Sequence, residues 1–346
     1  MHPLLDNLQK SRLQHGLATY NRFVLCAHVS PDGDAVGSTL GFYHYLKGMG
    51  KDVRVVLPNI FPDFLNWMPG ADEIVLFDKQ EKQARQLINN AEVICCLDFN
   101  VLSRLDDEMA EAVAASSAEF WMMDHHLQPA DFCRITLSYP ELSSTCEVVF
   151  RVIYELGGFP ALSYESAQAL YAGMCTDTGG FTYNSTRPEL YFILSCLLEK
   201  GIDKDKIYRQ IYHNNTLDRV RLEGYVLYEK LRHYEHYRAT LFTLTREEQK
   251  RFRFQKGDAE GLVNIPLTIQ NVRLSCSLRE DTEKPCIMVS LRSVDDFPAN
   301  QVAEEFFNGG GHVNAAGGKL FCSMEEAVDR YRQALERFES QLREGK

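Results

Sequence analysis

The chain has 346 residues, of which 45% are hydrophobic and 25% charged, and its formal net charge at pH 7 is −11. This length allows two domains of ordinary size, and the acidic balance excludes the broad basic surface with which proteins bind long nucleic acids. We therefore expect any nucleotide substrate to be short, and we expect no long duplex nucleic acid as a partner.

The sequence also indicates the cellular location of the protein. The N-terminal residues contain no apolar core of a signal peptide, and no apolar stretch approaches the ~20 residues of a membrane span. The 10 cysteines fall mostly inside apolar runs and form no CxxC pair, which is typical of buried thiols in a reducing compartment. We expect a cytoplasmic protein without membrane association, and the sequence does not decide between a monomer and a homodimer.

Strands and helices alternate through the first part of the chain, after an N-terminal helix. The expected strands cover residues 22–28, 53–57, 73–77, 92–98 and 119–124, and the expected helices cover 34–48, 80–90, 105–115, 143–156, 164–175 and 188–199. Such alternation is typical of βαβ units. It predicts an α/β catalytic domain over residues 1–200, with a mostly parallel sheet flanked by helices.

The remaining residues predict a linker and a second domain. Residues 201–236 are polar with helical spacing and are expected to form a linker helix or helix pair; their Tyr and His side chains could stack on a nucleobase, but an ordinary solvated helix explains them better. Residues 237–346 are expected to form a smaller α+β substrate-binding domain. Its expected strands cover 238–244, 272–278 and 286–292 and a segment near Lys319, and its expected helices cover 299–307 and 323–343.

Carboxylates and imidazoles recur where the expected strands end. His28 ends the first strand, Asp98 ends a later one, and Asp177 precedes two glycines at a helix end. The other members of the set are Asp32, Asp34, Asp124, His125 and His126. An isolated Asp-Gly-Asp more often forms a turn and a helix N-cap, but the carboxyl ends of parallel strands share one edge of a sheet, so these side chains are expected to gather there.

A cluster of four carboxylates and two imidazoles (Asp32, Asp34, Asp98 and Asp177 with His28 and His125) predicts a divalent metal site. Without a cation the carboxylates would repel one another and some of their pKa values would rise. Two ions are the natural count for six ligands with a bridging carboxylate. Mixed oxygen and nitrogen ligands favour Mn over Ca and do not select Zn, and they leave Co, Fe and Mg open.

With these residues in place, the sequence resembles the DHH phosphoesterase superfamily. Its motifs occur in the family order: HxxxDxD at His28, the strand-end Asp98, Asp-His-His at 124–126, Asp177, and GGGHxxAAG at 309–317. The resemblance implies two Mn ions, one held by His28, Asp32 and Asp98 and the other by Asp34, Asp98, His125 and Asp177, with Asp98 as the bridge. It also implies that Asp98, Asp124 and His126 serve catalysis, with His126 facing the substrate phosphate and Asp124 supporting the histidines.

The glycine-rich motif of the last hundred residues carries the second half of the expected site. Alone, the glycine loop is a weak signal, since it is neither a P-loop nor a dinucleotide-binding fingerprint, although its backbone amides could approach an anion. The resemblance implies that Arg292 and His312 bind phosphate, and that the substrate-binding set is completed by Ser293, Gly310, Gly311 and Asn314.

Within the superfamily, the pair of domains resembles the nano-RNase and 3'-phosphoadenosine-5'-phosphate (pAp) phosphatase type. This implies hydrolysis of oligoribonucleotides of about two to four nucleotides, whose few phosphates suit an acidic protein, and of pAp to AMP. One alternative is a hydrolase of cyclic dinucleotides or linear pNpN such as pApA. A more distant one is a manganese-dependent inorganic pyrophosphatase, against which the GGGH loop counts. A nucleotide sensor with a relict site is disfavoured because every expected ligand is present.

Overall fold

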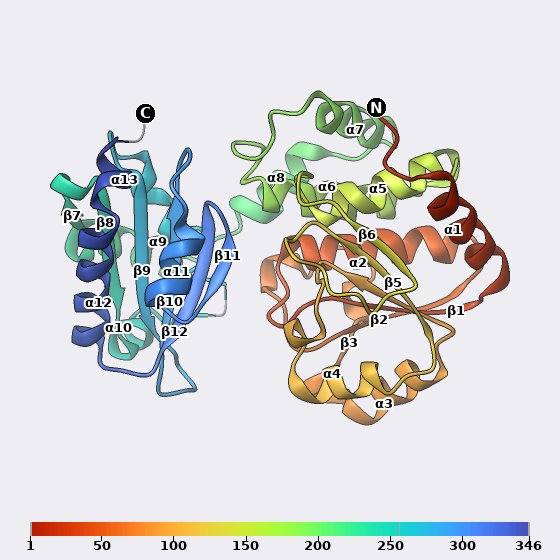
Figure 1. Cartoon of the computed structure of the whole chain (residues 1–346), viewed down its shortest axis with the longest axis horizontal. Coiled ribbons are helices and arrows are strands. Elements are labelled where there is room, and N and C mark those ends of the chain that lie inside the picture. Colours follow the sequence, from red (N-terminus) through yellow and green to blue (C-terminus); the bar gives the residue numbers. More distant parts are fainter. Residues whose placement is uncertain (1, 256, 345–346) are drawn as a thin grey trace. The chain divides into compact units, whose positions relative to one another are not determined.

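The computed structural model describes residues 2–255 and 257–344. The chain divides into two compact units, Met1–Asn214 and Asn215–Lys346 (Figure 1). The division falls within the stretch expected as a linker. Helix α8 (Lys204–Tyr212) accordingly packs on α6 (Tyr164–Asp177) of the first unit, whereas α9 (Leu217–Tyr225) contributes Leu222 to a core of the second unit.

The first unit contains a six-stranded, fully parallel sheet in the order β3-β2-β1-β4-β5-β6, which confirms the predicted parallel sheet. Its strands are β1 (Arg22–Cys26), β2 (Asp52–Leu57), β3 (Val75–Leu76), β4 (Val93–Leu97), β5 (Glu119–Asp124) and β6 (Ile135–Ser138). Strand β3 is shorter than predicted because helix α3 already begins at Phe77. Strand β6 was not predicted, because its four residues are too few to give a clear pattern.

Side chains of the central strands alternate between two cores. Leu25 and Cys95 face one core together with helices α2, α5 and α6, whereas Val24 and Ile94 face the other together with α3 and α4. This covering of both faces makes the central strands apolar throughout. The helices of the unit are α1 (Asn7–Thr19), α2 (Gly33–Gly48), α3 (Phe77–Asn90), α4 (Asp107–Ala114), α5 (Thr145–Glu155), α6 (Tyr164–Asp177), α7 (Pro188–Glu199) and α8.

Helices α2 and α6 are packed through glycines. A Cβ atom added at Gly37 would lie 2.7 Å from the carbonyl oxygen of Ala169, and one added at Gly33 would lie 2.3 Å from Oγ1 of Thr176. The two backbones therefore approach more closely than larger residues would permit. This contact brings the beginning of α2 next to the end of α6, where Asp177 lies.

The second unit contains a mixed sheet in the order β11-β12-β10-β9-β8-β7, in which β8 and β9 are parallel and the other pairs antiparallel. The predicted smaller domain with strands and helices is confirmed. Its strands are β7 (Arg232–Tyr234), β8 (Ala239–Leu244), β9 (Leu274–Glu280), β10 (Ile287–Ser293), β11 (Gly310–His312) and β12 (Ala315–Leu320). Its helices are α9, α10 (Arg246–Arg251), α11 (Ala299–Phe306), α12 (Met324–Arg337) and α13 (Glu339–Glu344).

Three local predictions for the second unit were wrong. The glycine loop is a β-hairpin of β11 and β12, and its glycines are required by close backbone contact, since a Cβ atom at Gly309 would lie 1.8 Å from the carbonyl oxygen of Gly317. The stretch 201–236, which was expected to be helical, contains strand β7 near its end, where Arg232–Tyr234 pair with β8. The single closing helix is two helices with a break at Phe338.

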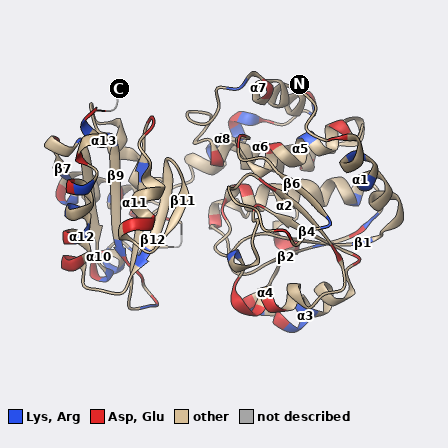
Figure 2. Ribbon diagram, viewed as in Figure 1, with Lys and Arg blue, Asp and Glu red and all other residues tan. Residues whose placement is uncertain are grey.

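Cysteine burial follows the prediction. All ten cysteines are free, and only Cys133 and Cys322 are partly exposed. Figure 2 shows Asp and Glu on both units with Lys and Arg interspersed among them, for instance along α12. Among the described residues, no helix combines the length and the apolar character needed to cross a membrane.

Candidate metal centre

The candidate ligands lie at the carboxyl edge of the parallel sheet. Strands β1 and β4 are neighbours at its centre, and the chain leaves them in opposite directions along the strand order. Open α/β sheets bind ligands at this switch point, where the loops after the two strands diverge. His28 follows β1 and Asp98 follows β4, so both residues are delivered to this position by the fold.

A first group of candidate ligands comprises His28, Asp32 and Asp98. Nε2 of His28 lies 3.2 Å from Oδ2 of Asp98 and 3.9 Å from Oδ2 of Asp32. Its other ring nitrogen, Nδ1, lies 2.9 Å from the carbonyl oxygen of Val29. With the proton on Nδ1 and donated to this carbonyl, the lone pair of Nε2 points toward the carboxylates, as a metal ligand requires.

A second group comprises Asp34, His125 and Asp177. Nε2 of His125 lies 3.4 Å from Oδ2 of Asp177 and 3.9 Å from Oδ2 of Asp34. It also lies 3.7 Å from Oδ1 of Asp98. Asp98 therefore has one carboxylate oxygen near the histidine of each group, which is the geometry that a bridging ligand needs.

His126 and Asp124 form a pair beside these groups. Nδ1 of His126 lies 2.8 Å from Oδ1 of Asp124, and its backbone amide donates to Oδ2 of the same carboxylate at 2.8 Å. Asp124 is fully buried, whereas the His126 side chain retains 16% exposure. The carboxylate thus fixes the imidazole and leaves part of the ring accessible.

Charges in the cluster perturb one another. Burial, together with the charges of Asp98 and Asp177, raises the pKa of Asp34 well above its usual range. Burial disfavours the protonated form of His28, but its hydrogen bond and charge interaction with Asp98 and the charge of Asp32 outweigh this and raise the pKa of His28 to about 9. Protons on neighbouring groups offset the repulsion among these carboxylates. A bound cation would offset this repulsion equally well.

The backbone of Asp98 adopts a left-handed conformation, with φ at +63°. Residues other than glycine rarely occupy this region, and they do so where the surrounding structure imposes it. The orientation of this carboxylate is therefore set by its neighbours, and we found one that sequence reasoning missed. Oγ1 of Thr145, the first residue of α5, donates a hydrogen bond to Oδ1 of Asp98 at 2.9 Å.

Asn100 is a second residue that sequence reasoning missed. This buried side chain donates hydrogen bonds to the carbonyl oxygens of His126 and Leu127, at 3.2 and 2.9 Å. It therefore ties the loop after β4 to the loop after β5. An asparagine after a strand-end aspartate was the only signal in the sequence, and asparagine is common in loops.

The predicted substrate-binding residues of the second unit are brought together by β10 and the β11–β12 hairpin. Arg292 pairs in register with Ala315, and its Nη1 donates to the carbonyl oxygen of Leu291 at 2.9 Å. The amide of Asn314 donates to Oγ of Ser293 at 3.0 Å, and Ser293 in turn donates to the carbonyl oxygen of Phe297 at 2.7 Å. Strand β11 carries the rest of the set, Gly310, Gly311 and His312.

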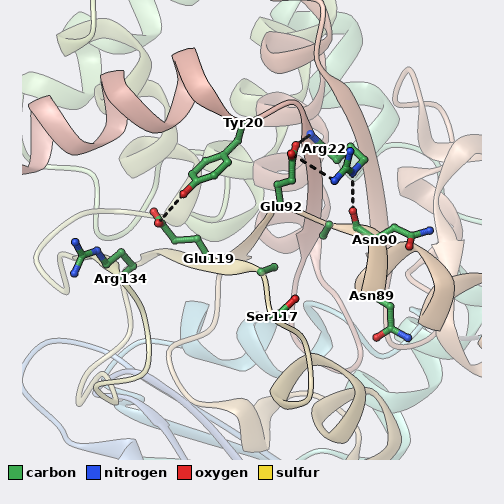
Figure 3. A pocket seen from close by; sticks show the side chains of 10 residues that line it. Tyr20, Arg22, Asn89, Asn90, Glu92, Ser117, Glu119 and Arg134 are labelled. Atoms are coloured by element: carbon green, nitrogen blue, oxygen red, sulfur yellow. Dashed lines mark hydrogen bonds and ion pairs between the residues drawn. The ribbon is translucent and has the colours of Figure 1, made fainter.

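A polar pocket lies at the opposite, amino-terminal edge of the parallel sheet (Figure 3). Some of its side chains are paired within the pocket: Tyr20 donates to Glu119 at 3.1 Å, and Nε of Arg22 donates to the carbonyl oxygen of Asn90 at 2.8 Å. None of the candidate metal ligands lines this pocket.

Comparison with known proteins shows the family of this chain. Residues 22–174 match the DHH family, N-terminal domain, and residues 239–342 match the DHHA1 domain. A solved structure described as an exopolyphosphatase-related protein from Bacteroides fragilis is similar over 99% of both chains, with 53% sequence identity and a TM-score of 0.95. The chain belongs to the DHH phosphoesterase family. It is a hydrolase that acts on phosphoester bonds.

Two named relatives extend over both domains. The bifunctional oligoribonuclease and PAP phosphatase NrnA of Thermus thermophilus is 28% identical over 90% of this chain and 88% of its own length. The cyclic-di-AMP phosphodiesterase GdpP of Bacillus subtilis is 24% identical over 91% of this chain but only 47% of its own length.

Proposed function

We propose that this protein is a manganese-dependent phosphoesterase that hydrolyses short oligoribonucleotides to mononucleotides and pAp to AMP. The observation that carries this proposal is the pair of ligand groups at the switch point of the sheet, with one carboxylate oxygen of Asp98 near the histidine of each. Two-domain relatives named oligoribonuclease and PAP phosphatase support the choice of substrates.

Each metal position would be held by residues of the first unit. His28, Asp32 and Asp98 would hold one ion, and Asp34, Asp98, His125 and Asp177 the other. Oxygen and nitrogen ligands without a thiolate suit Mn²⁺. When bound, two such ions would lower the pKa of a water molecule and neutralise charge on the reacting phosphate.

The protein's own side chains would orient the substrate. His126, which Asp124 holds through two contacts, would contact the phosphate as a positioned donor. From the second unit, Arg292 and His312 would bind a second phosphate or the end of the nucleotide, because a guanidinium binds phosphate through two parallel hydrogen bonds. The hydrogen bonds that join Asn314, Ser293 and Phe297 would keep the hairpin in place for this contact.

The charge of the protein supports short substrates. With a net charge of −11, binding by release of counterions from many phosphates would be weak, so affinity must come from a few defined contacts. Substrates of about two to four nucleotides present few other phosphates to the acidic surface. We also propose that the protein is cytoplasmic.

The second candidate is hydrolysis of cyclic dinucleotides or of linear pApA. The match to a cyclic-di-AMP phosphodiesterase over 91% of this chain favours it. The same metal ligands would serve either reaction, so the candidates differ in what the second unit accepts.

One assay separates these functions. Purified protein with Mn²⁺ is incubated with pAp, pApA, a trinucleotide RNA, cyclic di-AMP, pyrophosphate, polyphosphate and a long RNA, and products are resolved by chromatography. Samples with a chelator in place of Mn²⁺ serve as the control. The proposal expects AMP from pAp and mononucleotides from the short RNAs; preference for cyclic di-AMP would favour the second candidate, and inactivity on every phosphoester would reject both.

A further inference from the structure

The segment Leu142–Cys146, which comprises the three residues before α5 and the first two residues of the helix, contacts candidate ligands of both groups. The carbonyl oxygen of Leu142 lies 3.3 Å from Nδ1 of His125. The backbone amides of Thr145 and Cys146 donate to the two carboxylate oxygens of Asp34, at 2.6 and 3.0 Å. The family motifs named above include no residue of this segment.

Asp34 completes the amino-terminal cap of α5. The first amides of a helix have no partner within the helix, and here Ser144 accepts from the amide of Glu147 at 3.1 Å while Asp34 accepts from the two amides before it. The positive end of the helix thereby faces a carboxylate of the metal site. The first turn of α5 and Asp34 hold each other in place.

The hydroxyl of Thr145 adds the contact with Asp98. Thr145 is fully buried, and its hydrogen bond to Oδ1 of Asp98 occupies one side of that oxygen. A carboxylate oxygen has two lone pairs, so this oxygen keeps one for a second partner. The hydrogen bond from this hydroxyl limits where the carboxylate of Asp98 can point.

Glu147 holds the segment in place through hydrogen bonds. Its fully buried carboxylate accepts hydrogen bonds at Oε2 from the amide and the hydroxyl of Ser143, at 3.0 and 2.7 Å. The same oxygen accepts from Nη2 of Arg187 at 2.5 Å. Arg187 precedes α7 and ends the stretch that begins after Asp177. One carboxylate therefore fixes the start of α5 and the end of that stretch.

We propose that Thr145 is a positioning residue, whose hydroxyl orients the Asp98 carboxylate for metal binding, and that Glu147 holds the segment which presents it. This inference rests on the proposed metal-dependent function. Partners that orient metal ligands typically contribute about 10- to 100-fold to metal affinity. A threonine that only filled space at the start of α5 would contribute through its volume and not through its hydroxyl.

The test compares Thr145→Val with Thr145→Ser in the full-length protein. Valine keeps the shape and removes the hydroxyl, whereas serine keeps the hydroxyl and removes the methyl group. Mn²⁺ binding to the metal-free proteins is measured by isothermal titration calorimetry, without substrate. We expect Mn²⁺ affinity to fall about 10- to 100-fold in Thr145→Val and to remain within about threefold of the unmodified protein in Thr145→Ser, which preserves the oriented donor.

Thr39→Val provides a matched control. Thr39 is also fully buried in the first unit, but its hydroxyl donates to the carbonyl oxygen of Ala35 in its own helix at 2.8 Å. The chemical change is the same, so any general effect of losing a buried hydroxyl appears here as well. We expect Thr39→Val to lower thermal stability without lowering Mn²⁺ affinity.

A second pair keeps the test decisive if Thr145→Val does not fold. Thr145→Ala and Thr145→Ser both lack the methyl group and differ only in the hydroxyl. Equal Mn²⁺ affinities in this pair, or equal losses in Thr145→Val and Thr39→Val, would overturn the inference. Failure of the unmodified protein to bind Mn²⁺ would instead reject the proposed metal-dependent function, so the two failures are distinguishable.

Discussion

Asp98 places Oδ2 at 3.2 Å from Nε2 of His28 and Oδ1 at 3.7 Å from Nε2 of His125. The two histidines follow different strands, β1 and β5, and β4 lies between them in the sheet. A carboxylate in this position can serve both ligand groups. The loss of its charge is therefore expected to affect two metal ions together.

We predict that Asp98→Asn abolishes turnover and weakens the binding of both metal ions, whereas Asp32→Asn chiefly weakens the binding of one. The amide has the shape of the carboxylate but carries no charge and cannot neutralise two cations. Metal content per protein, measured after gel filtration, separates the variants. An Asp98→Asn protein that retains two Mn²⁺ and a near-normal rate would remove the bridge from the proposal.

We next predict that Arg292→Ala and His312→Ala weaken substrate capture and leave metal binding unchanged. Both residues belong to the second unit, whereas the carboxylates that would hold the ions belong to the first. The loss of a charge-assisted phosphate contact is expected to lower kcat/KM by on the order of a hundredfold. Steady-state kinetics with pAp test substrate capture, and calorimetry with Mn²⁺ tests metal binding. Loss of metal in either variant contradicts the assignment.

A third prediction concerns the glycine contact between α2 and α6. In Gly37→Ala, the new Cβ atom would lie 2.7 Å from the carbonyl oxygen of Ala169, so we expect destabilisation of about 1–3 kcal/mol from overpacking. The helices carry Asp34 and Asp177, so Mn²⁺ affinity should also fall. Thermal and urea unfolding with and without Mn²⁺ measure both effects.

Gly48→Ala is the control on the same helix. A Cβ atom added there meets nothing within 4 Å, and Gly48 does not have a positive φ. Alanine reduces the freedom of the unfolded chain, so this change should stabilise the protein by up to about 1 kcal/mol. Similar destabilisation by both substitutions would contradict the close-packing explanation.

The candidate metal centre could be predicted from the sequence because the fold itself delivers its ligands. His28, Asp98 and Asp124 follow or end apolar strands, and parallel strands bring their carboxyl ends to one edge whatever their exact bounds. The contact of Thr145 with Asp98 could not be predicted. It depends on where the start of α5 meets a strand distant in sequence, and the Ser and Thr residues there already have a local explanation as helix caps.

The glycine-rich hairpin is a feature for which the prediction from the sequence was wrong. The sequence predicts a glycine loop at Gly309, Gly311 and Gly317, because glycine is typical of turns and loops. In the structure, these glycines allow backbones to approach within distances that a Cβ atom would prevent. Close backbone approach and flexibility both select glycine, and composition alone does not separate them.

A fourth prediction uses Glu248 in the second unit. Burial opposes its ionisation, but hydrogen bonds from Lys230, the amide and hydroxyl of Thr245, and Tyr225 prevail and lower the pKa of Glu248 to about 2. A carboxyl whose pKa is lowered by folding stabilises the protein above its unfolded pKa of about 4.3. That contribution, on the order of 2 kcal/mol, is lost as the pH falls from there toward 2.

We therefore expect Glu248→Gln to lower the free energy of unfolding at pH 7 and to have a smaller effect at pH 3.5, in urea titrations of the metal-free protein. Glu247→Gln is the matched control, because Glu247 is an exposed neighbour on α10. An equal loss at both pH values would show that the glutamate acts through its shape and not through its charge.

The last prediction concerns substrate length. With a net charge of −11, the protein should turn over a dinucleotide or trinucleotide faster than a long RNA, whose additional phosphates meet an acidic surface. Moderate salt screens this repulsion, since the Debye length falls to about 8 Å at 0.15 M. The difference in rate between short and long substrates should therefore narrow as salt is added.

Time courses of mononucleotide release from 5'-labelled RNAs of increasing length, at low and at moderate salt with Mn²⁺, measure both trends. Arg292→Ala is the informative companion variant: it removes a proposed phosphate contact made by every substrate, so it should slow all lengths and leave the salt trend in place. If the repulsion argument is right, long RNA gains most from salt, because it carries the most unpaired phosphates. Rates on long RNA that equal or exceed those on a dinucleotide at low salt would contradict the short-substrate proposal and indicate a processive exonuclease of the same family.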